Sequence, residues 1–118
     1  MPKTIFLSYA HEDHKYVEKV VAQLRLKGIL GGDDSVVLDP ERSQVAVVRT
    51  RGVAIRQAIE SADQVVLLWT EAGEKSQWVN YEAGMADALG KLITVVLVGE
   101  ASPELPYSLR DVQVIRIT

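Results

Sequence analysis

One glutamate stands among apolar residues in a segment that is typical of a helix. Residues 76–91, SQWVNYEAGMADALGK, have helical periodicity, and at about 100° per residue Glu82 falls within the apolar stripe. The stripe is formed by Trp78, Met85, Ala86 and Leu89. Burying a charged carboxylate is costly unless a partner compensates it. Either Glu82 pairs with a buried arginine or caps backbone amides, or its carboxylate serves a reaction.

Other groups of residues that could carry out chemistry are weaker candidates for a functional site. His11 and His14 have no third ligand nearby in the sequence, so we expect no metal site. Ser8, His11 and Asp13 lie too close along the chain for a catalytic triad. The glycines of LGGD, at 30–33, lack the Lys-Ser/Thr ending of a phosphate loop and indicate a turn. We expect no resident cofactor, and Glu82 remains the leading candidate.

The composition narrows the class of protein. The chain has 118 residues, 47% of them hydrophobic, which predicts a single domain over 1–118. A net charge of −3 with scattered Lys and Arg argues against nucleic acid as a partner. The chain has no cysteine, and no apolar run reaches the roughly 18–20 residues that span a bilayer. We therefore expect a cytoplasmic protein that has no membrane partner.

Strand-like and helix-like segments alternate along the chain. Short apolar or β-branched runs predict five strands, at 4–9, 35–39, 64–70, 92–98 and 112–117. Apolar residues at three- and four-residue steps predict three helices, one following Asp13, one at about 50–61 and one at 76–91. We expect Asp13 and Ser76 to cap the first and third helices, which end at Gly28 and Gly90.

This alternation predicts an α/β fold with a parallel sheet and helices on both faces. Five strands favour the flavodoxin-like order 2-1-3-4-5, in which ligands bind outside the carboxyl ends of the strands. The loops SYAHED, DPERSQVAV and TEAGEKSQW follow the first three strands and share that edge. Trp78 and Glu82 are therefore expected to face the ligand crevice.

Three motifs together resemble a Toll/interleukin-1 receptor (TIR) domain, most closely its bacterial, NAD-cleaving members. They are IFLSYAHED before a helix, VVLD before a loop, and Ser76-x-Trp78-x-x-x-Glu82 before GK. The resemblance runs from about Ile5 to Thr118, almost the whole chain. It implies that a glutamate at the Glu82 position cleaves the nicotinamide–ribose bond of NAD⁺, which is then a substrate and not a cofactor.

The implied reaction suits a single carboxylate. Nicotinamide leaves as a neutral molecule from a cationic precursor, so no general acid is needed. The developing oxocarbenium ion requires a nearby negative charge and held ribose hydroxyls, and Glu82 could provide both. Trp78, one turn earlier, could stack on nicotinamide or wall the pocket; packing in the core is the alternative interpretation.

The resemblance also implies substrate contacts at the end of the first strand. Ser8, Tyr9 and Ala10 match the family positions there, with Ser76 at the start of the third helix. Many relatives carry basic residues just after the tyrosine, whereas this chain has Ala10 and His11.

The loop after the second strand holds further candidates for substrate binding. Arg42, Arg49 or Arg51 could supply the phosphate contact that Ala10 and His11 do not. Asp39 matches the aspartate that ends the second strand of the family. Because an Asp before Pro commonly initiates a turn, we favour a role for Asp39 in orienting this loop.

Two departures from the family pattern concern assembly. The chain stops after the fifth strand, where TIR domains commonly add a helix. One face of the sheet is therefore expected to be incompletely covered. A partner subunit or a sensor domain could cover it. The loop residues SQVAVV, at 43–48, lack the glycine and aromatic residue that many relatives carry. The assembly surface expected from the family therefore differs in this chain.

The resemblance leads to an NAD⁺ glycohydrolase that acts as an immune effector or signal producer in a prokaryote and is activated by TIR–TIR self-association. A non-catalytic TIR adaptor is the first alternative. The second is a nucleoside deoxyribosyltransferase, because YEAGMADALGK, at 81–91, resembles the Glu-x-Gly-x-Ala segment of those enzymes. Whether the product is linear or cyclic ADP-ribose depends on the shape of the pocket.

Overall fold

Parallel strands in the predicted order form the centre of the molecule. The computed structural model describes residues 2–38, 48–100, 103–105, 109 and 112–117, with the backbone alone at 48–54. Within these residues one five-stranded parallel sheet has the order β2-β1-β3-β4-β5, which confirms the predicted topology. The strands are β1 (Thr4–Ser8), β2 (Ser35–Leu38), β3 (Gln64–Leu68), β4 (Leu92–Val98) and β5 (Gln113–Ile117).

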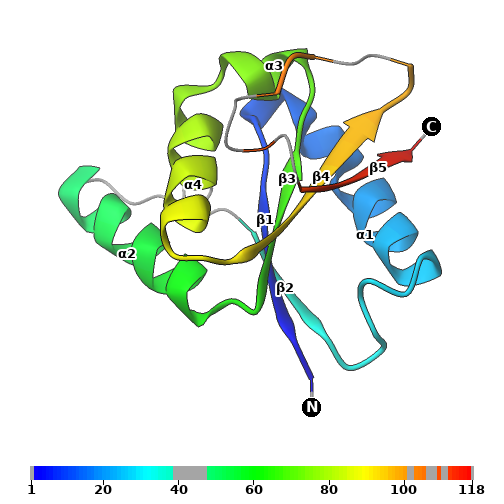
Figure 1. Ribbon diagram of the computed structural model, residues 1–118, viewed down its shortest axis with the longest axis horizontal. Helices are drawn as coiled ribbons and strands as arrows, with labels where there is room; N and C mark the ends of the chain where they lie inside the picture. The colour runs from blue at the N-terminus through cyan, green and yellow to red at the C-terminus, as the bar shows by residue number, and fades with distance from the viewer. Residues whose placement is uncertain (1, 39–47, 101–102, 106–108, 110–111, 118) are drawn as a thin grey trace.

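Helices cover both faces of the sheet, as α/β architecture requires. A 3₁₀ segment, η1 (His11–Tyr16), follows β1 and leads into the first α-helix. The α-helices are α1 (Val17–Leu26), α2 (Val48–Ser61), α3 (Glu71–Lys75) and α4 (Gln77–Ala88). In Figure 1, α2 and α4 lie on one side of the sheet and α1 lies on the other, while α3 lies at the carboxyl ends of the strands.

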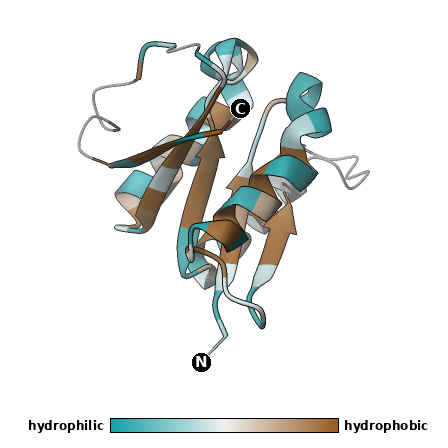
Figure 2. Cartoon of the chain, turned by 90° about the vertical axis from the view of Figure 1, so that its right-hand side faces the viewer, coloured by the Kyte–Doolittle hydropathy of each residue, from teal (hydrophilic) through white to brown (hydrophobic). Residues whose placement is uncertain are grey.

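Two apolar clusters, one on each face, hold the layers together. Residues of β1 alternate between them: Phe6 packs in the cluster under α2 and α4, whereas Ile5 and Leu7 pack in the cluster under α1. All five residues of β3 are buried. Figure 2 shows the strands as largely hydrophobic along their length. Central strands are covered on both faces, which is why they read as continuous apolar runs.

The stops at Gly28 and Gly90 and the cap at Ser76 are predicted correctly, whereas α3, which lies in a predicted loop, and the role of Asp13 are not. Gly28 and Gly90 adopt positive φ angles of 76° and 68°, and the Ser76 hydroxyl accepts a hydrogen bond from Val79 N at 3.1 Å. The prediction that Asp13 caps α1 is wrong, because α1 begins at Val17 after η1 and has no side-chain cap. Asp13 is buried instead, and it accepts a hydrogen bond from the Thr70 hydroxyl.

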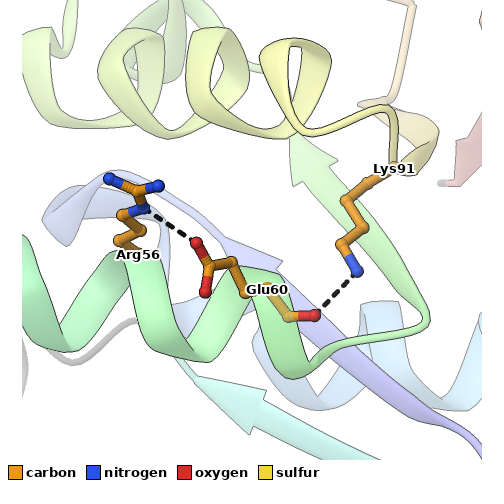
Figure 3. Close-up of polar contacts among 3 residues, drawn as sticks. All are labelled: Arg56, Glu60 and Lys91. Atoms are coloured by element: carbon orange, nitrogen blue, oxygen red, sulfur yellow. Dashed lines mark hydrogen bonds and ion pairs between the residues drawn. The ribbon is translucent and has the colours of Figure 1, made fainter.

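Polar contacts fix the amino-terminal edge of the sheet. The Lys91 ammonium donates to the backbone oxygens of Glu60 and Ala62 at 2.8 and 2.9 Å, at the end of α2 (Figure 3). Arg56 pairs with Glu60 one turn apart on the same helix at 2.8 Å. Lys91 thereby ties the end of α2 to the start of β4.

A ladder of side chains crosses three strands at the same edge. The Gln64 amide donates to the Thr94 hydroxyl at 2.7 Å, and that hydroxyl donates to Gln113 at 3.1 Å. Gln64 and Thr94 are buried, so a shifted register would leave their polar groups unsatisfied. The ladder therefore favours a single alignment of β3, β4 and β5.

The outer strands expose apolar side chains. Val37 and Leu38 of β2 are 38% and 37% exposed, and Val114 of β5 is 44% exposed. Among the described elements, α1 is the helix on its face of the sheet, whereas α2 and α4 share the other face. No helix within the described ranges is long and apolar enough to cross a membrane.

Asp34 is expected to make the stability of the fold depend on pH in the acid range. Its carboxylate accepts hydrogen bonds from Lys3 N and Gly31 N, both at 2.7 Å, and these bonds lower the pKa of Asp34 below its ordinary value of 3.8. The unfolded chain then binds the proton more readily, so this stabilisation is present above pH 3.8 and is lost as the pH falls through the folded pKa.

The test compares Asp34→Asn with the wild-type protein. We expect Asp34→Asn to have the lower urea midpoint at pH 7, and we expect the difference to narrow as the pH is lowered below about 3.8. Asp33→Asn is the matched control, since it removes the same charge one residue away and leaves both hydrogen bonds in place. A difference between Asp34→Asn and wild type that stayed constant with pH would contradict the assignment.

Candidate active site

The helix α4 carries Glu82 into the interior, as its periodicity predicts. The Ser76 cap fixes the start of α4, and the residues buried along this helix are Val79, Glu82, Ala83 and Ala86. Glu82 is 0% exposed. A glutamate is rarely buried to this degree without a specific partner. The surroundings of its carboxylate therefore decide what it can do.

The partner of the Glu82 carboxylate comes from the end of β1. Ser8 lies two residues after Phe6, so its side chain points to the same face of the sheet, toward α4. The Ser8 hydroxyl donates to Glu82 Oε1 at 2.5 Å, and both side chains are fully buried. This short distance is typical of a hydroxyl that donates to an ionised carboxylate. The bond holds the carboxylate at the carboxyl end of the central strand.

A pocket lies near this pair at the same edge of the sheet, although neither Ser8 nor Glu82 lines it. It has a volume of about 240 Å³ and is lined by residues of η1, α3 and the start of α4, among them Ala10, Ser76 and Trp78. Trp78 is half-buried and stands one turn before Glu82, and its ring stacks on Tyr81 with centroids 5.7 Å apart. We call this space the Trp78 pocket. The structure thus joins Ser8 to Glu82 by a hydrogen bond and groups Ala10, Ser76 and Trp78 around the pocket, with Trp78 one helical turn from Glu82.

Tyr9 is the predicted site residue that the structure places elsewhere. Because side chains alternate along an extended strand, its ring packs with the α1 cluster, on the face opposite to Ser8. The Tyr9 hydroxyl lies within hydrogen-bonding distance, 3.0 Å, of His14 Nδ1. The structure therefore does not bring the ring of Tyr9 to Glu82.

The remaining predicted contacts lie in the loop after β2. Asp39 and Arg42 are outside the described residues, and at Arg49 and Arg51 the backbone alone is described. Their roles in turn formation and phosphate binding stay predictions.

No local pattern in the sequence predicts the contacts between η1 and α3, two of the elements that line the pocket. Thr70, after β3, donates its hydroxyl proton to Asp13 of η1 and accepts from Gly73 N at 3.0 Å. Gly73 packs so closely that an added Cβ would lie 2.8 Å from the backbone oxygen of Leu68. Burial raises the pKa of Asp13, and the hydrogen bond from Thr70 opposes that shift. These contacts lock η1 and α3 together at the edge of the sheet.

Access to the carboxylate requires movement. Glu82 has no exposed surface in this structure, so a substrate atom can reach it only after covering side chains shift. Trp78 is the half-exposed neighbour on the same helix, and it lines the adjacent pocket. The geometry describes a carboxylate that is fixed in place but not open to solvent.

This arrangement defines a class: an α/β domain with a buried carboxylate at the carboxyl edge of a parallel sheet. A family model described as the TIR domain matches residues 5–118. The chain therefore belongs to the TIR domain family. Comparison with curated proteins gave no significant match.

Solved structures with the same fold include receptors and enzymes. The chain is 18% identical to the TIR domain of a Toll-related receptor from Hydra magnipapillata, covering 95% of this chain and 82% of that one, with a TM-score of 0.65. It is 21% identical to a CMP N-glycosidase from Clostridium botulinum, covering 98% and 88%, with a TM-score of 0.57.

A third similar structure is the 2-deoxyribosyltransferase from Bacillus psychrosaccharolyticus. The identity is 17%, the coverage is 98% of this chain and 85% of that one, and the TM-score is 0.66. At these identities the three likenesses establish the fold.

The hydrogen bond between Ser8 and Glu82 predicts a strong energetic coupling. Ser8→Ala leaves a buried carboxylate oxygen without its hydroxyl donor and should cost about 1–3 kcal/mol of unfolding free energy. In a Glu82→Leu background that penalty disappears, because no charge is left to satisfy. The double-mutant cycle should therefore give a coupling of about 0.5–3 kcal/mol by urea denaturation.

The control for this cycle is Ser61→Ala at an exposed site, which should change stability by less than about 0.5 kcal/mol. Additive effects of the Ser8 and Glu82 substitutions would show that the two side chains do not depend on each other.

Proposed function

We propose that this TIR domain is an NAD⁺ glycohydrolase that uses Glu82 to cleave the bond between nicotinamide and ribose. The observation that carries the proposal is the Glu82 carboxylate, buried and held by Ser8 beside the Trp78 pocket. A buried carboxylate on a ligand-binding edge is a typical arrangement for chemistry on a cationic centre.

The reaction needs little from the protein beyond a fixed negative charge. The C1′–N bond breaks, its electron pair passes to the nicotinamide ring, and nicotinamide leaves as a neutral molecule. The ribose becomes an oxocarbenium ion, which the Glu82 carboxylate stabilises in a site of low dielectric constant. Water then attacks C1′ and transfers its proton to the carboxylate, which releases it to solvent, and ADP-ribose forms. Attack by a group of the substrate itself would give a cyclic product.

The neighbouring residues have supporting roles in this proposal. Ser8 fixes the orientation of the carboxylate through its 2.5 Å hydrogen bond. Trp78 can stack on the nicotinamide ring, since it lines the pocket one turn from Glu82. Ala10 and Ser76 form the walls of the same pocket. We assign the phosphate contact of Arg42 and the loop role of Asp39 from the family resemblance alone.

We also propose that TIR–TIR self-association activates the enzyme. The enzyme would act in the cytoplasm as an effector or signal producer in prokaryotic immunity. It would consist of one domain or form part of a larger assembly with a sensor. The complete burial of Glu82 in the single chain supports this proposal. An assembly that shifts side chains beside the Trp78 pocket would expose the carboxylate.

A nucleoside-processing enzyme is the second candidate. The fold is as similar to the deoxyribosyltransferase, with a TM-score of 0.66, as to the TIR receptor domain, with 0.65. The names of that transferase and of the CMP N-glycosidase describe reactions at N-glycosidic bonds. A carboxylate such as Glu82 could take part in such a reaction. Nucleoside hydrolysis or base exchange without NAD⁺ cleavage would favour this candidate.

The decisive experiment measures NAD⁺ turnover against protein concentration. Nicotinamide release per molecule should rise as the wild-type protein assembles, and Glu82→Gln should lower kcat roughly 100- to 1000-fold. Because glutamine can still accept the Ser8 hydrogen bond, we expect this variant to fold. Glu18→Gln, an exposed substitution on α1, serves as the matched control.

Two outcomes would reject the glycohydrolase. The first is full activity in Glu82→Gln. The second is intact NAD⁺ at every concentration of assembled wild-type protein, which would leave an adaptor that acts through assembly alone.

A further inference from the structure

A second pocket adjoins the Trp78 pocket at the carboxyl edge of the sheet. It has a volume of about 490 Å³ and lies between η1, α3 and the end of β4. Glu12, Ala72 and Lys75 line both pockets. We call the larger space the Tyr16 pocket, after the half-buried aromatic residue in its wall. Since η1 and α3 are joined through Asp13 and Thr70, the two pockets are held in a fixed relation.

The size of the Trp78 pocket argues that it holds part of a dinucleotide. Ligand pockets usually have volumes of about 300–1,000 Å³, and the Trp78 pocket, at about 240 Å³, falls below that range. The Tyr16 pocket, at about 490 Å³, lies within it. A dinucleotide consists of two nucleosides joined by a diphosphate. Two adjoining pockets with a shared border match this division.

Lys75 provides a cation at the shared border. Its ammonium pairs with Glu71 at 3.0 Å, and the two side chains are 72% and 80% exposed. An ion pair so exposed contributes little to stability, so Lys75 can turn to a stronger anion at small cost. The segment after β1 has Ala10 and His11 in place of lysine or arginine. Lys75 reaches the same edge from α3 and also lines the Trp78 pocket.

The Tyr16 pocket has the chemistry of a nucleoside site. Its carboxylates, Glu12, Asp13 and Glu71, can accept hydrogen bonds from ribose hydroxyls, as acidic residues do in other dinucleotide sites. Tyr16 offers an aromatic surface for the base once the Lys15 ammonium, which lies 5.3 Å from the centroid of its ring, moves aside. The three carboxylates outnumber the two ammonium groups of the lining, Lys15 and Lys75, so the pocket disfavours a further phosphate on the ribose 2′-hydroxyl. The pocket therefore favours an unphosphorylated nucleoside.

We propose that the Tyr16 pocket binds the second nucleoside of the dinucleotide and that Lys75, between the pockets, binds its diphosphate. The proposal rests on the proposed NAD⁺ cleavage and adds two properties to it. One is selection of dinucleotides over smaller nicotinamide compounds. The other is selection of NAD⁺ over NADP⁺.

The test of Lys75 uses three substrates with the same scissile bond: nicotinamide riboside, nicotinamide mononucleotide and NAD⁺. Lys75→Gln should raise KM for NAD⁺ and the mononucleotide roughly 5- to 30-fold and leave KM for the riboside unchanged, because the riboside has no phosphate. Lys19→Gln removes the same charge from an exposed position on α1 and should change none of the three values. An equal change for all three substrates, or no change, overturns the role of Lys75.

The test of the Tyr16 pocket uses the 2′-phosphate. Wild-type protein should have a higher KM for NADP⁺ than for NAD⁺, and Glu12→Gln should narrow that difference severalfold. Because Glu12 also borders the Trp78 pocket, KM for nicotinamide riboside is measured in the same variant, and any change in it is subtracted before the values for NADP⁺ and NAD⁺ are compared. Equal use of NADP⁺ and NAD⁺ by the wild-type protein overturns the assignment of this pocket.

Binding of ADP-ribose separates this inference from the proposed reaction, because ADP-ribose has no nicotinamide bond to cleave. In calorimetry, Lys75→Gln should weaken ADP-ribose binding by the same factor that raises KM for NAD⁺, and Lys19→Gln should not. Absence of NAD⁺ cleavage with Lys75-dependent binding would reject the reaction and keep the site. NAD⁺ cleavage with ADP-ribose binding independent of Lys75 would reject the site and keep the reaction.

Discussion

The hydrogen bond from Ser8 to Glu82 connects the sheet to the helix that forms the site. It is 2.5 Å long and joins residues 74 positions apart in the chain, one at the end of β1 and the other in the middle of α4. Both side chains are fully buried. Loss of the hydroxyl donor would cost about 1–3 kcal/mol of unfolding free energy, so this contact helps to hold α4 on the sheet. Trp78 and its pocket take their positions from the same helix.

The two edges of the sheet serve different purposes. At the amino-terminal edge, Lys91 and the ladder from Gln64 through Thr94 fix helix ends and strand register. At the carboxyl edge, the polar contacts join loops and flank pockets, as Thr70 shows by linking η1 to α3. Parallel strands force this division, because all loops after the strands meet at one edge. The chain can therefore place reactive and charged groups at that edge without disturbing the register of the sheet.

The sequence predicted the parts of the structure that follow from local patterns. Sheet order, the cap at Ser76 and the burial of Glu82 come from periodicity and from turn chemistry, which act over a few residues. The partner of Asp13 is Thr70, 57 positions away, and no local signal indicates that pair. The Tyr16 pocket and the position of Lys75 likewise depend on how α3 packs against η1. Local patterns identify which residues are unusual, whereas long-range contacts decide which of them meet.

Burial of Glu82 and the reaction proposed at Glu82 make opposite demands, and α4 indicates how both could be met. A water-free site strengthens the interaction of the carboxylate with a developing positive charge, yet the substrate must still enter. Val79 and Ala83 belong to the core, and moving them would expose apolar surface on two elements at once. Trp78 is already half-exposed at the pocket and makes a stacking contact with exposed Tyr81. Of these neighbours on α4, Trp78 is therefore the one whose movement exposes the least core surface, and under the proposed function a side-chain movement there would open the site without unfolding.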